Sequence, residues 1–254
     1  MTELHTRAVT IGITDYRDSD KIVTFYSEKY GKITGIAKGA KRSKKRFVNK
    51  LEFFSLLNII LIPSRKSTLY RLDRAELINP YQPLCESYLK YTAAMVTTEL
   101  TKGLTRDNDC DENIFRLLTW TLDNISGGDS IDILETVVLF HLKLLDVTGF
   151  LPQLSRCVSC TNEPDREAIF VPSADGILCA DCLPLTGLPP SSRLSLNTVK
   201  ILKMARSLPL EKLSRLKLSV NSCRESFRMF KICISYLLQR EIHSWQQFEK
   251  IMKI

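Results

Sequence analysis

The stretch FFSLLNIILIPSRKSTLYRLDRAELI, residues 53–78, decides the fold of the N-terminal part of the chain. Residues 53–62 and 69–78 are rich in aliphatic and aromatic side chains, and a polar segment that begins at Pro63 separates them. This pattern is typical of two strands joined by a turn. Three earlier runs have the same character, at residues 4–13, 21–27 and 32–37. Five short strands in one segment predict a small closed barrel, of which the OB-fold is the commonest five-stranded form.

After Pro80 the apolar residues recur at helical spacing, i, i+3 and i+4. We expect helices at residues 88–100, 113–125, 132–147, 196–208, 222–241 and 243–252. Between the third and fourth of these helices, residues 155–190 are irregular and contain four of the eight cysteines. The chain contains no recognisable internal repeat.

The four clustered cysteines form two pairs, Cys157-Val-Ser-Cys160 and Cys179-Ala-Asp-Cys182. Two CxxC pairs at this separation are typical of a zinc ribbon, in which four thiolates surround one Zn²⁺. Four unrelated thiols and a redox pair are the alternatives, although redox chemistry needs only one CxxC pair. Because four protein ligands leave no position for water, we expect one structural Zn²⁺ per chain.

The expected fold class is therefore α+β. An N-terminal five-stranded OB-fold barrel occupies residues 1–79, and an α-helical domain follows at residues 80–254, with a four-cysteine zinc finger inserted at 155–190. Net charge is +8 and is unevenly distributed, because residues 80–156 are acidic while both flanking parts are basic. Two basic ends favour binding of a polyanion, and the acidic middle favours a scaffold or a protein-binding surface.

The densest positive charge lies at residues 29–50, which contain nine basic side chains and no acidic one. Like charges at this density repel one another, so a phosphate backbone is their natural partner, although a merely solvated loop is the alternative. The candidate nucleic-acid-binding residues are Lys38, Lys41, Arg42, Lys44, Lys45, Arg46 and Lys50. Tyr16, Phe47 and Tyr70 are candidate platforms for stacked bases, with a place in the core as the alternative for each.

A second basic surface is expected on the helix at residues 222–241. Apolar side chains follow one face of it, at Cys223, Phe227, Phe230, Ile234 and Leu237. Arg224, Arg228 and Lys231 follow another face. This basic face binds nucleic acid or an acidic peptide, or is simply solvated, and the sequence leaves all three open.

Other signals are absent from the sequence. No apolar stretch approaches the ~20 residues of a membrane span, and residues 1–6 show no secretory signal, so we expect a cytoplasmic protein without a membrane partner. Asp107-Asn-Asp109-Cys-Asp111 resembles the start of a calcium loop but lacks its glycine and its final glutamate, which favours a loop leading into a helix cap. No P-loop is present. His5, His141 and His243 form no recognisable triad, so no catalytic residue is expected.

Short motifs in a fixed order resemble the RecO family of bacterial recombination mediators. In the first half they are Asp18-Ser-Asp20-Lys21, Tyr30-Gly31-Lys32, Ala37-Lys38-Gly39-Ala40 and Leu77-Ile78-Asn79-Pro80-Tyr81. In the second half, Gly149-Phe150-Leu151-Pro152 precedes the first cysteine pair and Gly176-Ile-Leu-Cys179 opens the second, as in members that keep a zinc finger. Two positions depart from the family pattern: Thr161 and Asp175 stand where glycine is usual or frequent.

The resemblance implies a protein, not an enzyme, that binds single- and double-stranded DNA and anneals complementary strands. It implies that the chain works with RecR to help load RecA onto strands coated with single-strand-binding protein (SSB), at the nucleoid. SSB presents an acidic tail, for which Arg224, Arg228 and Lys231 are one candidate surface and the region of Arg116 and Lys143 is another. Two alternatives remain, an RNA-binding OB/zinc-ribbon protein of translation or transcription, and a zinc hydrolase.

Overall fold

The computed structural model describes residues 3–43, 46–64, 67–188 and 191–254. Lys44 and Lys45 of the predicted basic segment, and Arg65 and Lys66 of the predicted turn, lie outside these ranges. The chain divides into two compact units, Met1–Gly127 and Gly128–Ile254, which we describe separately. The predicted domain boundary between residues 79 and 80 separates the barrel from the helices, whereas the two units are separated between residues 127 and 128. The domain boundary stays a prediction.

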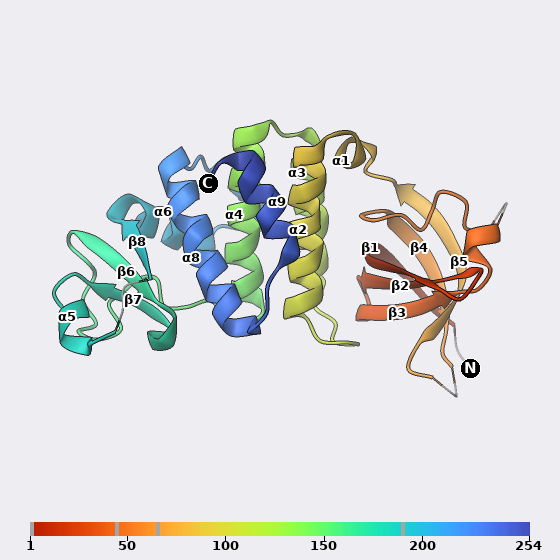
Figure 1. The fold of residues 1–254 in the computed structure, drawn as a ribbon, viewed down its shortest axis with the longest axis horizontal. Helices are drawn as coiled ribbons and strands as arrows, with labels where there is room; N and C mark the ends of the chain where they lie inside the picture. Colours follow the sequence, from red (N-terminus) through yellow and green to blue (C-terminus); the bar gives the residue numbers. More distant parts are fainter. Residues whose placement is uncertain (1–2, 44–45, 65–66, 189–190) are drawn as a thin grey trace. The chain divides into compact units, whose positions relative to one another are not determined.

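The first unit contains a closed five-stranded barrel, as the sequence predicts (Figure 1). Its strands are β1 (Leu4–Tyr16), β2 (Asp20–Ser27), β3 (Gly31–Ala37), β4 (Leu56–Ile62) and β5 (Tyr70–Asn79). The order around the barrel is β1-β2-β3-β5-β4, and every neighbouring pair is antiparallel except β3 and β5. The predicted strand at residues 53–62 begins later, at Leu56, because Phe54 adopts a left-handed φ of 70° that ends the preceding turn.

The barrel core is built from alternate residues of all five strands, such as Phe25 on β2 and Ile33 on β3. On β3 and β4 the residues between them are less buried, which is the alternation expected of a strand with one buried face, whereas residues 8–12 of β1 are all buried. Phe47 and Leu51, from the connection between β3 and β4, also belong to this core. The connection that carries the predicted basic residues is therefore anchored in the barrel interior.

In the described part of the first unit, the barrel is followed by the α-helices α1 (Gln82–Glu86), α2 (Tyr88–Leu104) and α3 (Glu112–Gly127). The loop between α2 and α3 is fastened to the barrel. Lys32 Nζ donates to the Thr105 carbonyl oxygen over 2.5 Å, and the Asn108 N–H donates to the Lys32 carbonyl oxygen over 2.8 Å. At Gly31, with φ of 63°, a Cβ atom would lie 1.9 Å from the Asp109 carbonyl oxygen. Only glycine permits this close approach.

The predicted helix cap is also present at the start of α3, since the Asp111 carboxylate accepts the Asn113 N–H over 2.8 Å.

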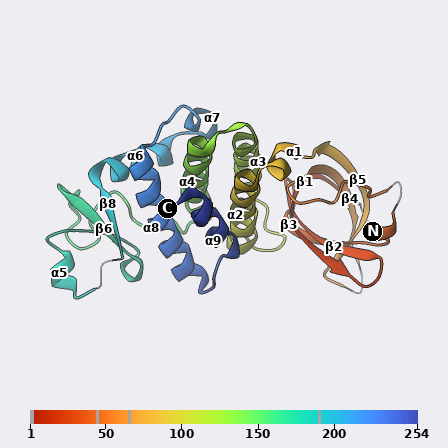
Figure 2. The same ribbon diagram turned by 45° about the horizontal axis from the view of Figure 1, so that its top comes forward.

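The second unit combines a group of helices with a small sheet that lies at one end of that group (Figure 2). Its helices are α4 (Ser130–Val147), α5 (Leu183–Thr186), α6 (Leu196–Ser207), α7 (Leu210–Leu213), α8 (Val220–Leu238) and α9 (His243–Met252). Its strands are β6 (Glu167–Val171), β7 (Gly176–Cys179) and β8 (Ser192–Ser195), in the order β7-β6-β8, with the short 3-10 helix η2 (Pro172–Ala174) between β6 and β7. The sequence left this sheet as an irregular segment, because none of its strands exceeds five residues.

His141 lies at the centre of the helical part of this unit. Its ring stacks on Trp245, accepts the Trp245 Nε1–H at Nε2 over 3.2 Å, and places Nδ1 2.5 Å from the Val137 carbonyl oxygen. Burial lowers the pKa of His141 to about 4, so the ring is neutral near pH 7. The contacts of His141 are therefore those of a core residue that packs and hydrogen-bonds within the helices. None of the helices in the described ranges has the length and apolar character needed to span a lipid bilayer.

Candidate metal centre and nucleic-acid interface

The four predicted metal ligands come together in the second unit. The Sγ atoms of Cys157, Cys160, Cys179 and Cys182 all lie within 4.8 Å of one another, and Cys157 and Cys182 are buried. This spacing fits four thiolates around a tetrahedral ion with bonds of ~2.3 Å. The structure therefore places the predicted ligand set at one point, and a metal ion fits the site.

Local hydrogen bonds form the two cysteine turns. In the first turn, the Thr161 N–H donates to the Cys157 carbonyl oxygen over 2.9 Å, and in the second the Cys182 N–H donates to the Cys179 carbonyl oxygen over 3.2 Å. Burial disfavours the Cys157 thiolate, but hydrogen bonds from backbone N–H groups, including that of Cys160, outweigh burial and lower the pKa of Cys157 to about 6. Amides aimed at sulfur favour the thiolate, which is the form that binds metal.

The two positions that depart from the family pattern both have left-handed backbone. Thr161 has a φ of 64° and Asp175 a φ of 50°. Glycine adopts these values freely, whereas a side chain there costs conformational energy. The backbone geometry of the turns is thus the one that glycine favours, and the two side chains are accommodated at a cost. Neither position supplies a metal ligand.

The predicted basic segment lies where β3 leads into β4. The short 3-10 helix η1 (Ala40–Arg42) follows Gly39, whose N–H donates to the Asp20 carboxylate over 2.8 Å. Lys41 Nζ donates to the Arg17 carbonyl oxygen over 3.1 Å and lies 3.1 Å from the Asp15 carboxylate. These contacts hold the start of the segment against the turn between β1 and β2.

The end of the segment is held as well. Ser43 Oγ accepts the N–H groups of Arg46 and Phe47 at 3.0 Å each, and the Arg46 guanidinium lies 4.3 Å from the centroid of the Phe47 ring. Four described cations of this segment are exposed: Lys38, Lys41, Arg42 and Arg46. Lys50 is half-buried. Exposed cations on an anchored backbone are suited to phosphate contacts.

The candidate stacking residues differ in availability. Phe47 is 4% exposed and belongs to the barrel core, so it offers no face to a base. Tyr70 is half-buried and its hydroxyl donates to Asn108 Oδ1 over 3.0 Å. Tyr16 is 37% exposed, with the Arg17 guanidinium 5.1 Å from its ring centroid. Of the three, Tyr16 is the most accessible.

The predicted basic face of α8 is less open than the sequence suggests. Lys231 Nζ lies 2.7 and 2.8 Å from the two carboxylate oxygens of Glu249 on α9. Arg224 is half-buried, and its Nε is buried without a hydrogen-bond partner among the described residues. Arg228 is exposed. The rival residue Lys143 uses its ammonium to donate to the Arg206 and Leu208 carbonyl oxygens, at the end of α6.

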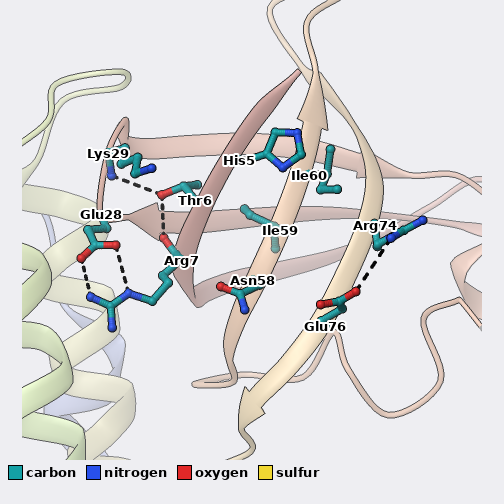
Figure 3. Close-up of a pocket in the computed structure, with 10 residues that line it drawn as sticks. All are labelled: His5, Thr6, Arg7, Glu28, Lys29, Asn58, Ile59, Ile60, Arg74 and Glu76. Atoms are coloured by element: carbon teal, nitrogen blue, oxygen red, sulfur yellow. Dashed lines mark hydrogen bonds and ion pairs between the residues drawn. The ribbon is translucent and has the colours of Figure 1, made fainter. Parts of the chain in front are cut away.

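Sequence reasoning missed a cavity of about 340 Å³ on the outer face of β1, β4 and β5. Figure 3 shows its lining side chains, among them His5, Asn58, Ile60, Arg74 and Glu76. They form cross-strand rows, because His5 pairs with Ile60 and Ile60 with Arg74. The signal that could have revealed it is the alternation of outward polar residues along these strands.

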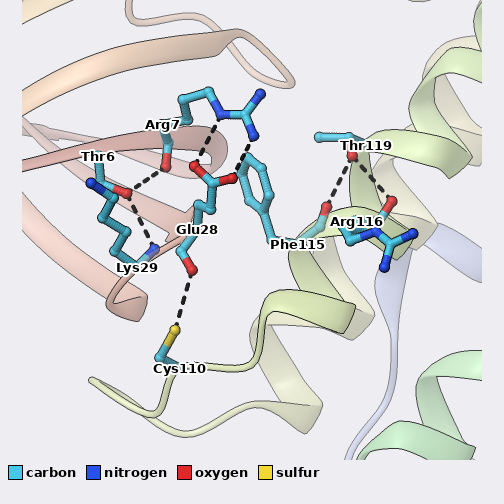
Figure 4. Close-up of polar contacts among 8 residues, drawn as sticks. All are labelled: Thr6, Arg7, Glu28, Lys29, Cys110, Phe115, Arg116 and Thr119. Atoms are coloured by element: carbon cyan, nitrogen blue, oxygen red, sulfur yellow. Dashed lines mark hydrogen bonds and ion pairs between the residues drawn. The ribbon is translucent and has the colours of Figure 1, made fainter.

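One edge of this cavity is closed by an ion pair within the first unit. The Arg7 guanidinium donates to both carboxylate oxygens of Glu28, and its carbon lies 5.6 Å from the centroid of the Phe115 ring on α3 (Figure 4). Cys110 Sγ donates to the Glu28 carbonyl oxygen over 3.2 Å. Arg7 and Glu28 therefore join the barrel to the α2–α3 segment, so these two charges have a structural role.

Comparison with known proteins identifies the family. Residues 1–81 match the family model described as Recombination protein O N terminal, and residues 85–246 match the model described as Recombination protein O C terminal. The chain is 29% identical over 251 residues to the DNA repair protein RecO of Syntrophus aciditrophicus strain SB, covering 98% of this chain and 96% of that protein. It is 32% identical over 183 residues to the DNA repair protein RecO of Geobacter metallireducens, covering 72% and 73% of the two chains. The chain therefore belongs to the RecO family of DNA repair and recombination proteins.

Proposed function

We propose that this chain binds single- and double-stranded DNA and anneals complementary strands, as a mediator without catalytic chemistry of its own. In this proposal it acts with RecR to help load RecA onto SSB-coated single strands, in the cytoplasm at the nucleoid. The observation that carries the DNA-binding part is the exposed set of Lys38, Arg42 and Arg46 on a segment anchored at both ends. The ion pair of Lys41 with Asp15 would have to open for Lys41 to bind phosphate as well. Family membership supports the mediator role.

Anchoring matters for binding because ordering a free loop costs entropy at the moment of association. Phe47 and Leu51 fix the segment in the barrel core before DNA arrives. Cations held in this way neutralise phosphates without reading base sequence, which suits a protein that must act on any gap or break. Tyr16 adds an accessible ring for a stacked base, a contact that only unpaired strands offer.

We propose that the metal is Zn²⁺ and that its role is structural. Cys157, Cys160, Cys179 and Cys182 form a complete four-thiolate set, which is the chemistry that zinc ribbons use. Bound there, the ion joins the two cysteine turns at one point. Since Cys179 is the last residue of β7, the ion would also tie the small sheet to the first cysteine turn. The proposed function needs no open coordination position on the metal.

The SSB tail requires cations beside an apolar surface. For Arg224, Arg228 and Lys231 this stays a proposal, and the exposure of Arg228 is the feature that favours it. The ion pair of Lys231 with Glu249 would have to open for Lys231 to take part.

The proposal is tested with the double charge reversal Lys38→Glu and Arg42→Glu, which leaves the structural contacts of Lys41 intact. Losing two phosphate contacts should lower affinity for any single-stranded oligonucleotide and reduce the slope of log K against log salt by about 1.4. Annealing of bare and SSB-coated strands should slow together. Fluorescence anisotropy at several salt concentrations and an annealing assay measure these effects.

The matched control is Lys200→Glu with Lys212→Glu, which changes the net charge equally at exposed positions of the second unit. If the Lys38/Arg42 variant kept the affinity and slope of this control, the basic segment would not be the DNA site. Tighter binding of structured RNA than of complementary DNA strands would instead favour the RNA-binding alternative.

A further inference from the structure

A second cavity, of about 410 Å³, lies in the second unit where α4, β6, η2 and the last turn of α8 meet. Its floor is formed by Phe170 and Cys233, both buried. Three large apolar side chains that line it are open to solvent: Phe150 is 42% exposed, Tyr236 53% and Leu237 36%. Exposed apolar side chains gathered around one hollow mark interaction surfaces more often than isolated ones do.

Asp175 is the one charged residue among the described residues that line this cavity. It has a left-handed φ of 50°, a backbone conformation that glycine adopts more readily than aspartate. A carboxylate kept in strained backbone beside a cavity suggests that the side chain is useful there. Its negative charge reaches the floor, since burial first and the Asp175 charge second raise the pKa of the Cys233 thiol to about 12.

The end of α8 adds to this negative potential. The helix ends at Leu238, next to the lining residues Tyr236 and Leu237, and Gln239 closes it with an N–H that donates to the Ser235 carbonyl oxygen. Carbonyl groups at a helix C-terminus carry partial negative charge and favour cations. Because no basic side chain is among the described lining residues, the cavity is poorly suited to an acidic tail.

We propose that this cavity is a docking site for a partner protein segment that presents a lysine or arginine next to a large apolar side chain. The apolar side chain enters between Phe150, Tyr236 and Leu237, and the cation lies by Asp175. Three exposed apolar side chains and one carboxylate line the same cavity, so a segment with an apolar side chain next to a cation can contact both at once. This surface is separate from the basic segment at residues 38–50, and the inference does not depend on DNA binding.

The test uses two peptides, acetyl-Gly-Ser-Trp-Arg-Leu-Ser-Gly-amide and its counterpart with Glu in place of Arg. Each is titrated into the full chain while backbone amide resonances are followed by NMR. We expect the arginine peptide to shift the amides of Gly149, Asp175 and Leu237, and to bind about tenfold more tightly than the glutamate peptide. Asp175→Asn should remove most of this preference and leave only the part due to the end of α8, because asparagine tolerates left-handed backbone and lacks the charge.

Asp165→Asn is the matched control, since Asp165 is an exposed carboxylate of the same unit that does not line the cavity. It should keep the full preference. Equal binding of the two peptides to the unsubstituted chain, or shifts confined to residues outside the cavity, would overturn the proposal. So would a concentration-dependent dimer in sedimentation that Leu237→Glu dissociates, because the cavity would then be occupied by a second copy of the chain.

Discussion

The barrel of the first unit and the β7-β6-β8 sheet of the second unit are held together in different ways. Among the described residues, the barrel core contains twelve buried side chains from five strands and from the connection that leads to β4. The core on one side of the small sheet contains five, of which two are the candidate metal ligands Cys157 and Cys182. The barrel core therefore rests on apolar burial alone, whereas one side of the small sheet combines apolar burial with the cysteine cluster, although Phe170 and Leu194 are also buried. We therefore expect the small sheet to depend more strongly on its cysteine cluster.

The two predicted basic surfaces, the segment at residues 38–50 and the basic face of α8, also differ from each other. The basic segment of the first unit is anchored by apolar side chains, and Lys38, Arg42 and Arg46 are exposed there, although Lys41 pairs with Asp15. On α8, by contrast, Lys231 is engaged with Glu249 and Arg224 is half-buried. Two segments with similar charge patterns thus offer different numbers of available cations.

The largest effect is expected from removing one metal ligand. Cys160→Ser should lower the free energy of unfolding of the second unit by several kcal/mol, because metal binding and folding of the small sheet are coupled. Chelation of the unsubstituted chain should have the same effect. Urea unfolding followed by circular dichroism measures the loss, and metal analysis should find one zinc per freshly purified chain.

Cys85→Ser provides the control, since Cys85 is exposed and lies outside the cluster. If Cys160→Ser unfolded at the same urea concentration as Cys85→Ser, the small sheet would not depend on the metal. The contrast with the barrel would then disappear.

The second effect tests the barrel. Phe47→Ala should destabilise the chain by about 3–5 kcal/mol, because the aromatic ring is buried in the core and its removal leaves a cavity. Affinity for single-stranded DNA should fall as well, since the basic segment loses an anchor. The neighbouring Val48→Ala, at a 42% exposed side chain, should change stability by about 0.5 kcal/mol or less. Equal effects of the two substitutions in urea unfolding would mean that the segment is not anchored by packing.

The smallest effect concerns the cysteine turn. Thr161→Gly should stabilise the chain by about 1 kcal/mol, because glycine relieves the left-handed strain at a φ of 64° and this gain exceeds the added entropy of the unfolded chain. Thermal unfolding of the zinc-loaded chain measures it. Asn162→Gly, one position later and without positive φ, should destabilise. A loss of stability for Thr161→Gly would show that the hydrogen bond from Thr161 Oγ1 to the Cys160 carbonyl outweighs the strain.

The amino-acid sequence by itself determined the five-stranded barrel, the six longer helices that follow it and the four-cysteine cluster, but it did not predict the short helices α1, α5 and α7. Each of these depends on a regular local spacing: alternation for strands, i, i+3, i+4 for helices, and CxxC for metal turns. Such spacings predict local structure well because the conformation of a short segment depends largely on neighbouring residues. The departures at Thr161 and Asp175 could also be seen in the sequence, and the structure adds that both have positive φ.

Only the tertiary structure decided which of the predicted binding side chains are free to contact a ligand. Phe47 fills the barrel core, Lys143 donates to two carbonyl oxygens at the end of α6, and Lys231 pairs with Glu249. The cavity beside Asp175 was also invisible in the sequence, because Phe150, Asp175 and Tyr236 come from three separate segments. Local spacing says which face of an element a side chain occupies, but its partner comes from residues far away in the chain, and only packing brings those residues together.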